Sequence, residues 1–246
     1  MDFIDKGSRD PTPKYYRLQT LVREQIESGK WGPGEAIPTE EELASTHGLS
    51  LNTVRKAIIN LVSEGYLHRR QGKGTFVSGS TIRRENLRSY RMLREFDRDE
   101  AGLRIRFLEL GRTGGSENIR RRLKTRATQD LYEVKRLFLC QDRPLVYTDS
   151  YLPANLFKGL EKIAPEEWEK KSLYILLEDR YGVTTVVQRE LFSVRRAEGA
   201  LCEALHVKPG FPLLVIDMVA LTYKERPCEY RISYCLTDTH RVYREK

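Results

Sequence analysis

The first 80 residues carry apolar positions at helical spacing, separated by short turn signals. Three stretches, 15–26, 43–44 and 54–62, place apolar residues on one side of a helix, so each predicts a helix with a single buried face. The second begins with Thr39 and Glu42 at the spacing of a capping box, and the third begins at Ser50. Two short runs, 66–70 and 75–77, predict strands that meet at a Gly-Lys-Gly tip.

Three helices followed by a β-hairpin are typical of a winged helix-turn-helix, which places its third helix in the major groove of DNA. We assign it residues 14–79. Residues 55–73 hold five Lys and Arg side chains against Glu64 alone, and such basic groups bind phosphates with an affinity that falls as salt rises. The alternative is a merely solvated charged face. The residues predicted to bind DNA are Thr39, Ser50, Asn52, Thr53, Arg55, Lys56, Arg69, Arg70, Gly72, Lys73 and Gly74.

The remainder of the chain mixes strand and helix patterns. Residues 1–13 read as a flexible arm and 80–94 as a basic linker. From 95 to 244, we predict strands at 105–110, 130–140, 145–153, 184–194, 213–221 and 227–237, and helices at 117–123, 172–179 and 196–206. Hairpin-connected strands with interspersed helices indicate an α+β domain around an antiparallel sheet.

Composition indicates the kind of partner that the protein binds and excludes several classes of protein. A net charge of +8 favours a polyanionic partner, and 39% hydrophobic residues suffice for packed cores. No run reaches the roughly 18 apolar residues of a membrane span, and the N-terminus lacks a secretory pattern, so we expect a cytoplasmic protein. Neither the cysteines nor the histidines have metal-ligand spacing, and we expect no metal and no cofactor. These residues are Cys140, Cys202, Cys228 and Cys235, and His47, His68, His206 and His240.

Residues 14–77 resemble the N-terminal domain of the GntR family of bacterial transcription regulators. The resemblance rests on the Pro38-Thr39-Glu40 approach, the Thr53-Val54-Arg55 of the third helix and the wing from Gly72 to Val77. It implies that Arg55 and the backbone at Gly72 and Gly74 contact DNA. Glu41 and Leu51 stand where the family usually has arginines, so we expect an operator that differs from the family's usual one.

Residues 88–244 resemble the UTRA effector-binding domain of the HutC subfamily, whose fold is shared with chorismate lyase. The marks are Tyr151-Leu152-Pro153, Ser172-Leu173-Tyr174, Gly210-x-Pro-Leu-Leu214 and Pro227-x-Glu229-Tyr230. The resemblance implies that a small, often anionic effector binds Arg136, Thr148, Ser172 and Glu229. Phe138 and Leu236 replace two arginines of the family pattern, which predicts a less polar pocket. The alternative is that neither residue binds a ligand. In that case, Ser172 only caps a helix, and Arg136 is only a charged residue on the surface of a strand.

The leading hypothesis is a repressor that binds a palindromic operator as a homodimer, because two-fold protein symmetry mirrors operator symmetry, and that a small effector releases. An enzyme is the competing class, but fold alone carries no activity, and the sequence offers no catalytic arrangement of residues. A third reading is a constitutive DNA-binding protein whose second domain binds nothing.

Overall fold

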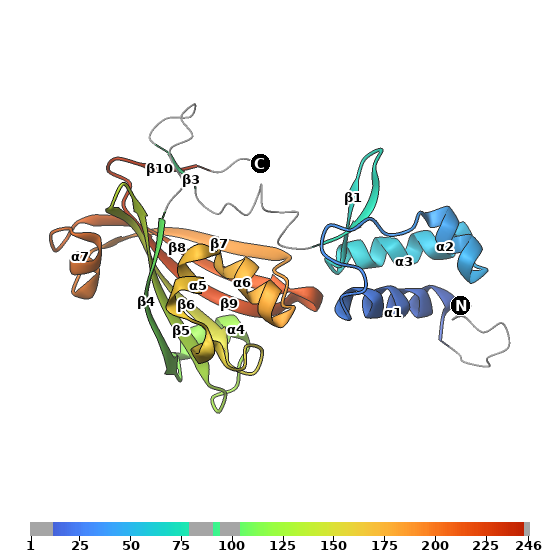
Figure 1. Ribbon diagram of the computed structural model, residues 1–246, viewed down its shortest axis with the longest axis horizontal. Helices are drawn as coiled ribbons and strands as arrows, with labels where there is room; N and C mark the ends of the chain where they lie inside the picture. The colour runs from blue at the N-terminus through green and yellow to red at the C-terminus, as the bar shows by residue number, and fades with distance from the viewer. Residues whose placement is uncertain (1–11, 79–90, 94–103, 244–246) are drawn as a thin grey trace. The chain divides into compact units, whose positions relative to one another are not determined.

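The computed structural model describes residues 12–78, 91–93 and 104–243 (Figure 1). The chain divides into two compact units: Met1–Ile82 with Tyr223–Glu225, and Arg83–Thr222 with Arg226–Lys246. The predicted arm is described only at residues 12 and 13, and most of the predicted linker lies outside the described residues. Within that linker range, β3 (Arg91–Leu93) pairs antiparallel with β10 (Arg241–Tyr243).

The first unit contains the three predicted helices and the hairpin. They are α1 (Lys14–Glu27), α2 (Glu40–His47), α3 (Leu51–Ser63), β1 (Leu67–Arg70) and β2 (Gly74–Val77). One apolar stripe of each helix meets the others in a single core, which includes Leu18, Leu43, Val54, Ile58 and Leu61. The chain before α2 also joins the wing, because Ala36 forms a β-bridge with Phe76. The hairpin is therefore tied to the helical core.

Helix caps fix where α2 and α3 begin. Thr39 Oγ1 accepts from the Glu42 amide (3.2 Å), and Glu42 Oε2 accepts from the Thr39 amide (2.7 Å), which is the predicted capping box. Gly48 ends α2 with a φ of 61°, a conformation that glycine adopts at little cost. The short turn to Ser50 then sets the direction of α3.

The second unit is built on a six-stranded antiparallel sheet in the order β4-β5-β6-β9-β8-β7 (Figure 1). The strands are β4 (Arg104–Thr113), β5 (Leu131–Cys140), β6 (Arg143–Pro153), β7 (Val187–Arg196), β8 (Pro212–Thr222) and β9 (Arg226–Cys235). The β5–β6 turn has Gln141 and Asp142 at φ of 48° and 65°, as a two-residue hairpin requires. The predicted α+β class with an antiparallel sheet is confirmed.

Helices cover both faces of this sheet. On one face, α5 (Pro165–Lys170) and α6 (Leu173–Tyr181) pack through Trp168, Leu173 and Leu177 against β5, β6 and β8. On the other, α4 (Glu117–Leu123) lies against Leu131 and Tyr230, and α7 (Ala200–Leu205) against β5 and β8. Two short 3-10 helices lie in connections: η2 (Leu160–Lys162) between β6 and α5, and η3 (Tyr223–Glu225) between β8 and β9. The face under α5 and α6 is called the inner face below.

Two helices of the second unit differ from the prediction. The helix expected from 196 begins only at Ala200, because β7 continues to Arg196, opposite Pro212. Gly199 then turns the chain with a φ of 53°. Apolar residues at helical spacing near 197 are explained by burial of Ala197, whose amide donates to Phe211 O (2.8 Å). Helix α5 was missed because only Trp168 of its six residues is buried.

Candidate functional site

The N-terminal end of α3 presents polar side chains to solvent. Val54, Ala57, Ile58 and Leu61 turn toward the core and are fully buried. The helical period therefore leaves the predicted residues Asn52, Arg55 and Lys56 exposed. Ser50 and Thr53 have a local task, since Ser50 Oγ accepts from the Thr53 amide (3.2 Å) and lies 2.8 Å from Thr53 Oγ1. Thr39 likewise caps α2 with its hydroxyl.

One carboxylate joins the predicted recognition helix to the wing. Glu40 accepts from Arg55 Nε (3.0 Å) through Oε2 and from Arg69 through Oε1 (2.6 Å). The Arg55 and Arg69 side chains are about half exposed, whereas that of Glu40 is mostly buried. Glu40 thus brings together two guanidinium groups that are 14 residues apart in the sequence, and their remaining donors stay available for phosphate or base edges.

The wing tip exposes backbone at glycines. Gly72 and Gly74 have φ of 70° and 116°, which side-chain-bearing residues rarely adopt, and a Cβ at Gly72 would meet no atom within 4 Å. Arg70 lies over the Phe76 ring at 5.1 Å, while Lys73 is exposed at the tip. The wing therefore offers a bare backbone flanked by cations, as a phosphate contact requires.

In the second unit, three of the four predicted ligand residues lie on the inner face of the sheet. Arg136 on β5 pairs with Thr148 on β6, and Thr148 pairs with Ser233 on β9. Because side chains alternate along a strand, Glu229 and Arg231 of β9 point to the same side as Ser233. Arg136, Glu229 and Arg231 are 1%, 1% and 4% exposed. These three form the buried charged cluster.

The buried charged cluster holds two arginines against one glutamate and leaves polar atoms without partners. Glu229 Oε1 lies 3.9 Å from Arg231 Nε, and neither Glu229 oxygen accepts a hydrogen bond from a described residue. Arg136 Nε and Ser150 Oγ also lack partners among the described residues. Unsatisfied buried polar groups are costly, so in this state the cluster is not a self-sufficient structural network.

Burial dominates the electrostatics of Arg136. Loss of hydration, and to a smaller extent the charge of the neighbouring Arg231, lower its pKa to about 10, although Glu229 and the phenol of Tyr174 act in the opposite direction. Its guanidinium also lies over the Phe138 ring, 5.4 Å from the centroid. The interpretation of Arg136 as a surface charge is wrong, because the sheet and the helices above it enclose the side chain. Thr148, also buried, donates its hydroxyl to Arg136 O (3.3 Å).

Helix α6 contributes to the buried charged cluster through its second residue. Tyr174 is buried, its hydroxyl accepts from Arg231 Nη2, and its ring lies 5.2 Å from the Arg231 guanidinium carbon. Ser172 is the N-cap of α6 and accepts from the Ile175 amide (3.5 Å). Ser172 is thus shown as a cap, and its contact with a ligand stays a prediction.

Sequence reasoning missed Arg231 and Tyr174. Arg231 follows Glu229 by two residues, so strand alternation alone places both on one face. Tyr174 lies within the Ser172-Leu173-Tyr174 segment, in which only the serine is predicted to bind a ligand. Phe138 on β5 stands where the family pattern has a second arginine. In this chain, Arg231 on β9 supplies the second guanidinium group of the cluster.

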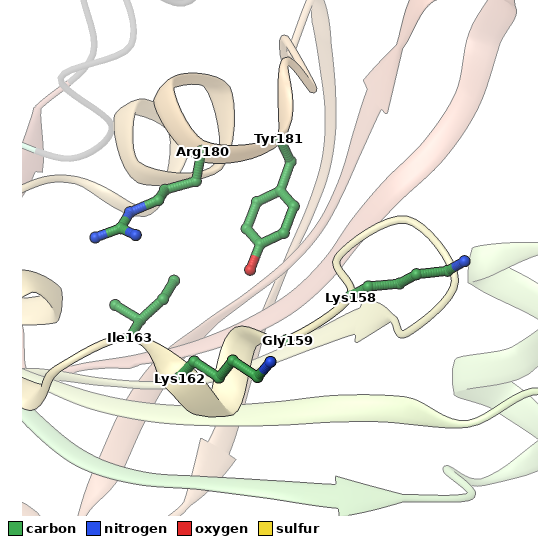
Figure 2. A pocket seen from close by; sticks show the side chains of 6 residues that line it. All are labelled: Lys158, Gly159, Lys162, Ile163, Arg180 and Tyr181. Carbon is green, nitrogen blue, oxygen red and sulfur yellow. The ribbon is translucent and has the colours of Figure 1, made fainter.

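A pocket opens on the surface near the end of α6, away from the buried charged cluster. It has a volume of about 350 Å³ and is lined by Lys158, Gly159, Lys162, Ile163, Arg180 and Tyr181 (Figure 2). Arg180 donates to both oxygens of Glu167 (2.5 and 2.6 Å). None of the predicted ligand residues lines this pocket, and its charge is partly neutralised by that ion pair.

Two further searches cover only the described parts of the chain. There, no group of three or more His, Cys, Asp and Glu residues is arranged to hold a metal ion. No helix there is long and apolar enough to cross a membrane.

Comparisons with known families match both units. Residues 14–77 match the family described as bacterial regulatory proteins, gntR family, and residues 101–241 match the UTRA domain. The second match covers more than half of the chain. It contains all four predicted ligand residues, and the first contains all the predicted DNA-binding residues.

Individual relatives extend over nearly the whole chain. The HTH-type transcriptional regulator YurK of Bacillus subtilis is 31% identical, over 97% of this chain and 96% of its own length. The HTH-type transcriptional repressor NagR of Bacillus subtilis is 26% identical and covers 85% of each chain. Among solved structures, the ligand-binding domain of a GntR-family regulator from Bordetella bronchiseptica has a TM-score of 0.56 and 32% identity. That match covers 64% of this chain and 98% of the other. These relatives are named as regulators of transcription and not as enzymes.

Proposed function

The chain belongs to the GntR family of bacterial regulatory proteins and carries a UTRA domain, and from this premise we propose that it is a repressor released by a small anionic effector. Regulation of transcription follows from the family. The proposal adds the chemistry of the effector, its site at the buried charged cluster, and a homodimer on a palindromic operator in the cytoplasm. The observation that carries it is the cluster of Arg136, Glu229 and Arg231, which is buried, has an excess cation and contains unsatisfied polar atoms.

An anionic group is what this cluster lacks. Two guanidinium groups and one carboxylate leave one uncompensated positive charge in a region removed from water. Taking charge out of water without a partner is unfavourable, and Arg136 Nε has no acceptor among the residues that the structure describes. A carboxylate or phosphate that accepts from Arg136 would neutralise the excess charge and supply the missing acceptor.

Glu229 indicates which groups the effector would carry besides its anionic group. Its two oxygens accept no hydrogen bond from a described residue, so they would accept from hydroxyl or amino groups of a ligand. The aromatic rings of Phe138 and Tyr174 flank the two arginines and favour a ligand with a flat or apolar part. An anion that also carries hydrogen-bond donors, such as a hydroxy acid, an amino acid derivative or a sugar phosphate, fits this pattern.

The first unit supports the DNA half of the proposal. Asn52 and Arg55 on α3, and Arg69 with the Gly72–Gly74 tip on the wing, provide exposed amide, guanidinium and backbone groups. Amide and guanidinium side chains at a recognition helix read adenine and guanine edges, and the wing glycines suit contacts with phosphate. A second copy of the chain would present the same set to the other half of a palindrome.

Binding measurements test both halves. We would select preferred DNA sites from a random pool and measure affinity by fluorescence anisotropy, with and without a metabolite panel of carboxylates, sugar phosphates, sulfonates and uncharged sugars. We expect palindromic sites and a loss of affinity with one anionic class. The same ligand should raise the unfolding midpoint, because a ligand that binds only the folded state stabilises it.

The reading in which the second domain binds nothing makes the opposite prediction. In that case, neither DNA affinity nor the unfolding midpoint responds to any compound. If uncharged sugars alone act, the anion argument from Arg136 is refuted while effector control stands. Selected sites without two-fold symmetry would refute the homodimeric operator.

A further inference from the structure

The surface pocket at the end of α6 carries positive charge that the protein leaves uncompensated. It is formed by residues 158–163, which follow β6 and include η2, and by the last two residues of α6. We call it the basic pocket, because its lining includes the cations Lys158, Lys162 and Arg180. Arg180 is paired with Glu167, whereas neither lysine has an ion-pair partner among the described residues. Two positive charges therefore remain at this pocket.

The acidic residue between the two lysines in the sequence is engaged elsewhere. Glu161 Oε1 lies 3.5 Å from Arg112 Nη2, and Glu161 Oε2 accepts from the Tyr132 hydroxyl (2.5 Å). These contacts hold the carboxylate against β4 and β5, so it does not pair with Lys158 or Lys162. A hollow lined by charges of one sign concentrates counter-ions of the other sign. The basic pocket should therefore attract anions.

The turn at Gly159 places Lys162 at the rim of the basic pocket. Gly159 has a φ of 80°, and the Lys162 amide donates to Gly159 O (3.0 Å). The stem of Lys162 lies along this turn, since a Cβ at Gly159 would be 3.6 Å from Lys162 Cδ. Because only the stem is in contact and the residue is exposed, the ammonium group stays available to a ligand.

The other lining residues supply an apolar wall and a hydrogen-bond donor. Ile163 is buried, and the Tyr181 ring packs edge-on against Phe157 with the ring centroids 5.5 Å apart. Figure 2 shows the Tyr181 hydroxyl directed toward the side of the pocket that Gly159 and Ile163 form. This hydroxyl donates to no described residue, and burial raises the pKa of Tyr181, so the phenol keeps its proton.

We propose that the basic pocket is a second ligand site, which binds a small phosphate monoester. Such a group carries a charge of about −1.5 to −2 at pH 7, which matches two uncompensated lysines better than the single charge of a carboxylate. Lysine ammonium groups bind phosphate as point charges on flexible stems. The apolar part of the ligand would lie against Ile163 and the Tyr181 ring. The volume of about 350 Å³ lies near the lower end of small-molecule sites, about 300–1,000 Å³.

Calorimetric titration of the full-length protein with phenyl phosphate tests this site. Phenyl phosphate joins a phosphate to a flat ring, and phenol offers the ring alone. The titrations use the Arg136→Met variant, because it lacks the arginine that we propose binds an anion in the buried charged cluster. We expect saturable binding of phenyl phosphate with a dissociation constant of about 1 mM or tighter, and no saturation by phenol over the same range.

Variants in the same background locate the binding. Lys158→Gln with Lys162→Gln should weaken binding of phenyl phosphate at least about tenfold, because both charge-assisted contacts are lost. The matched control is Lys124→Gln with Lys208→Gln, which changes the net charge equally at two exposed lysines outside the pocket. Because solvent and salt screen distant charges, the control should change binding less than about twofold. Tyr181→Phe keeps the ring and should weaken binding about threefold through the lost hydroxyl.

The outcomes separate the basic pocket from the proposed effector site. Equal losses in the two lysine pairs would show a general attraction of anions to a basic protein and overturn the basic pocket. Phenyl phosphate that saturates the wild type but not Arg136→Met belongs to the buried charged cluster, which overturns the basic pocket and leaves the effector proposal standing. Saturation of neither protein also overturns the basic pocket, while the metabolite panel still tests the effector.

Discussion

Replacing Arg136 by methionine should stabilise the protein in the absence of ligand. Burial lowers the pKa of Arg136 from 12.5 to about 10. One pKa unit corresponds to about 1.4 kcal/mol, so the charged guanidinium is held there at a cost of about 3 kcal/mol. Methionine has similar reach and no charge. Allowing for imperfect packing, we expect Arg136→Met to raise the free energy of unfolding by about 1–3 kcal/mol.

The matched control is Arg231→Met, which should have the opposite sign. Arg231 donates to the Tyr174 hydroxyl and forms an ion pair with Glu229. Its removal leaves a buried carboxylate without its ion-pair partner, and breaking a buried pair typically costs about 3–5 kcal/mol. The two variants should thus differ in sign because the protein itself partners Arg231, whereas Arg136 is the residue that we propose binds a ligand.

The two tryptophans allow the second unit to be followed alone. Trp31 lies in the first unit, whereas Trp168 is buried in the core over the inner face of the sheet. In a Trp31→Phe background, urea unfolding followed by fluorescence reports on Trp168. If Arg136→Met destabilises this unit as strongly as Arg231→Met, Arg136 is an ordinary structural ion, and the argument from an uncompensated charge is refuted. Loss of the midpoint rise with the effector in Arg136→Met would complete the case.

Three further predictions concern charge. Arg55→Ala should weaken binding to the selected operator. If Arg55 contacts a phosphate, the plot of log affinity against log salt concentration should have a slope shallower by about 1 in this variant than in the wild type. Glu40→Gln should raise affinity for unrelated DNA more than the control variant Glu41→Gln, because Glu40 forms ion pairs with Arg55 and Arg69. Equal affinities of the two variants in fluorescence anisotropy would refute the claim that Glu40 restrains these arginines. The pKa of Asp149 is raised from 3.8 to about 6, chiefly by burial. Because the folded protein favours the protonated form of Asp149, the free energy of unfolding should fall as pH rises from about 4 to 6. Asp149→Asn should remove that slope in urea titrations, and an unchanged slope would assign it to other groups.

Local sequence signals determined most of the first unit. Thr39 and Glu42 fix the start of α2 through contacts only three residues apart, and Ser50 does the same for α3. The helical period then decides which side of α3 is buried, and therefore that Asn52 and Arg55 are exposed. Such features depend on neighbours within one or two turns, so one chain suffices to predict them. What the sequence did not reveal is that Glu40 joins Arg55 to Arg69, because that contact depends on how α2, α3 and the wing pack.

The candidate ligand site depended far more on tertiary structure. The sequence alone identified Arg136, Thr148, Ser172 and Glu229 through resemblance, and strand alternation could have added Arg231. Only the order of strands in the sheet brings β5 and β9 to either side of β6, and only the packing of α6 over that face buries Arg136 and adds Tyr174. Burial is a collective property of segments nearly 100 residues apart. The sequence by itself therefore determined which side chains are charged, whereas the fold decided that water is excluded from them, and that exclusion makes the cluster a candidate binding site.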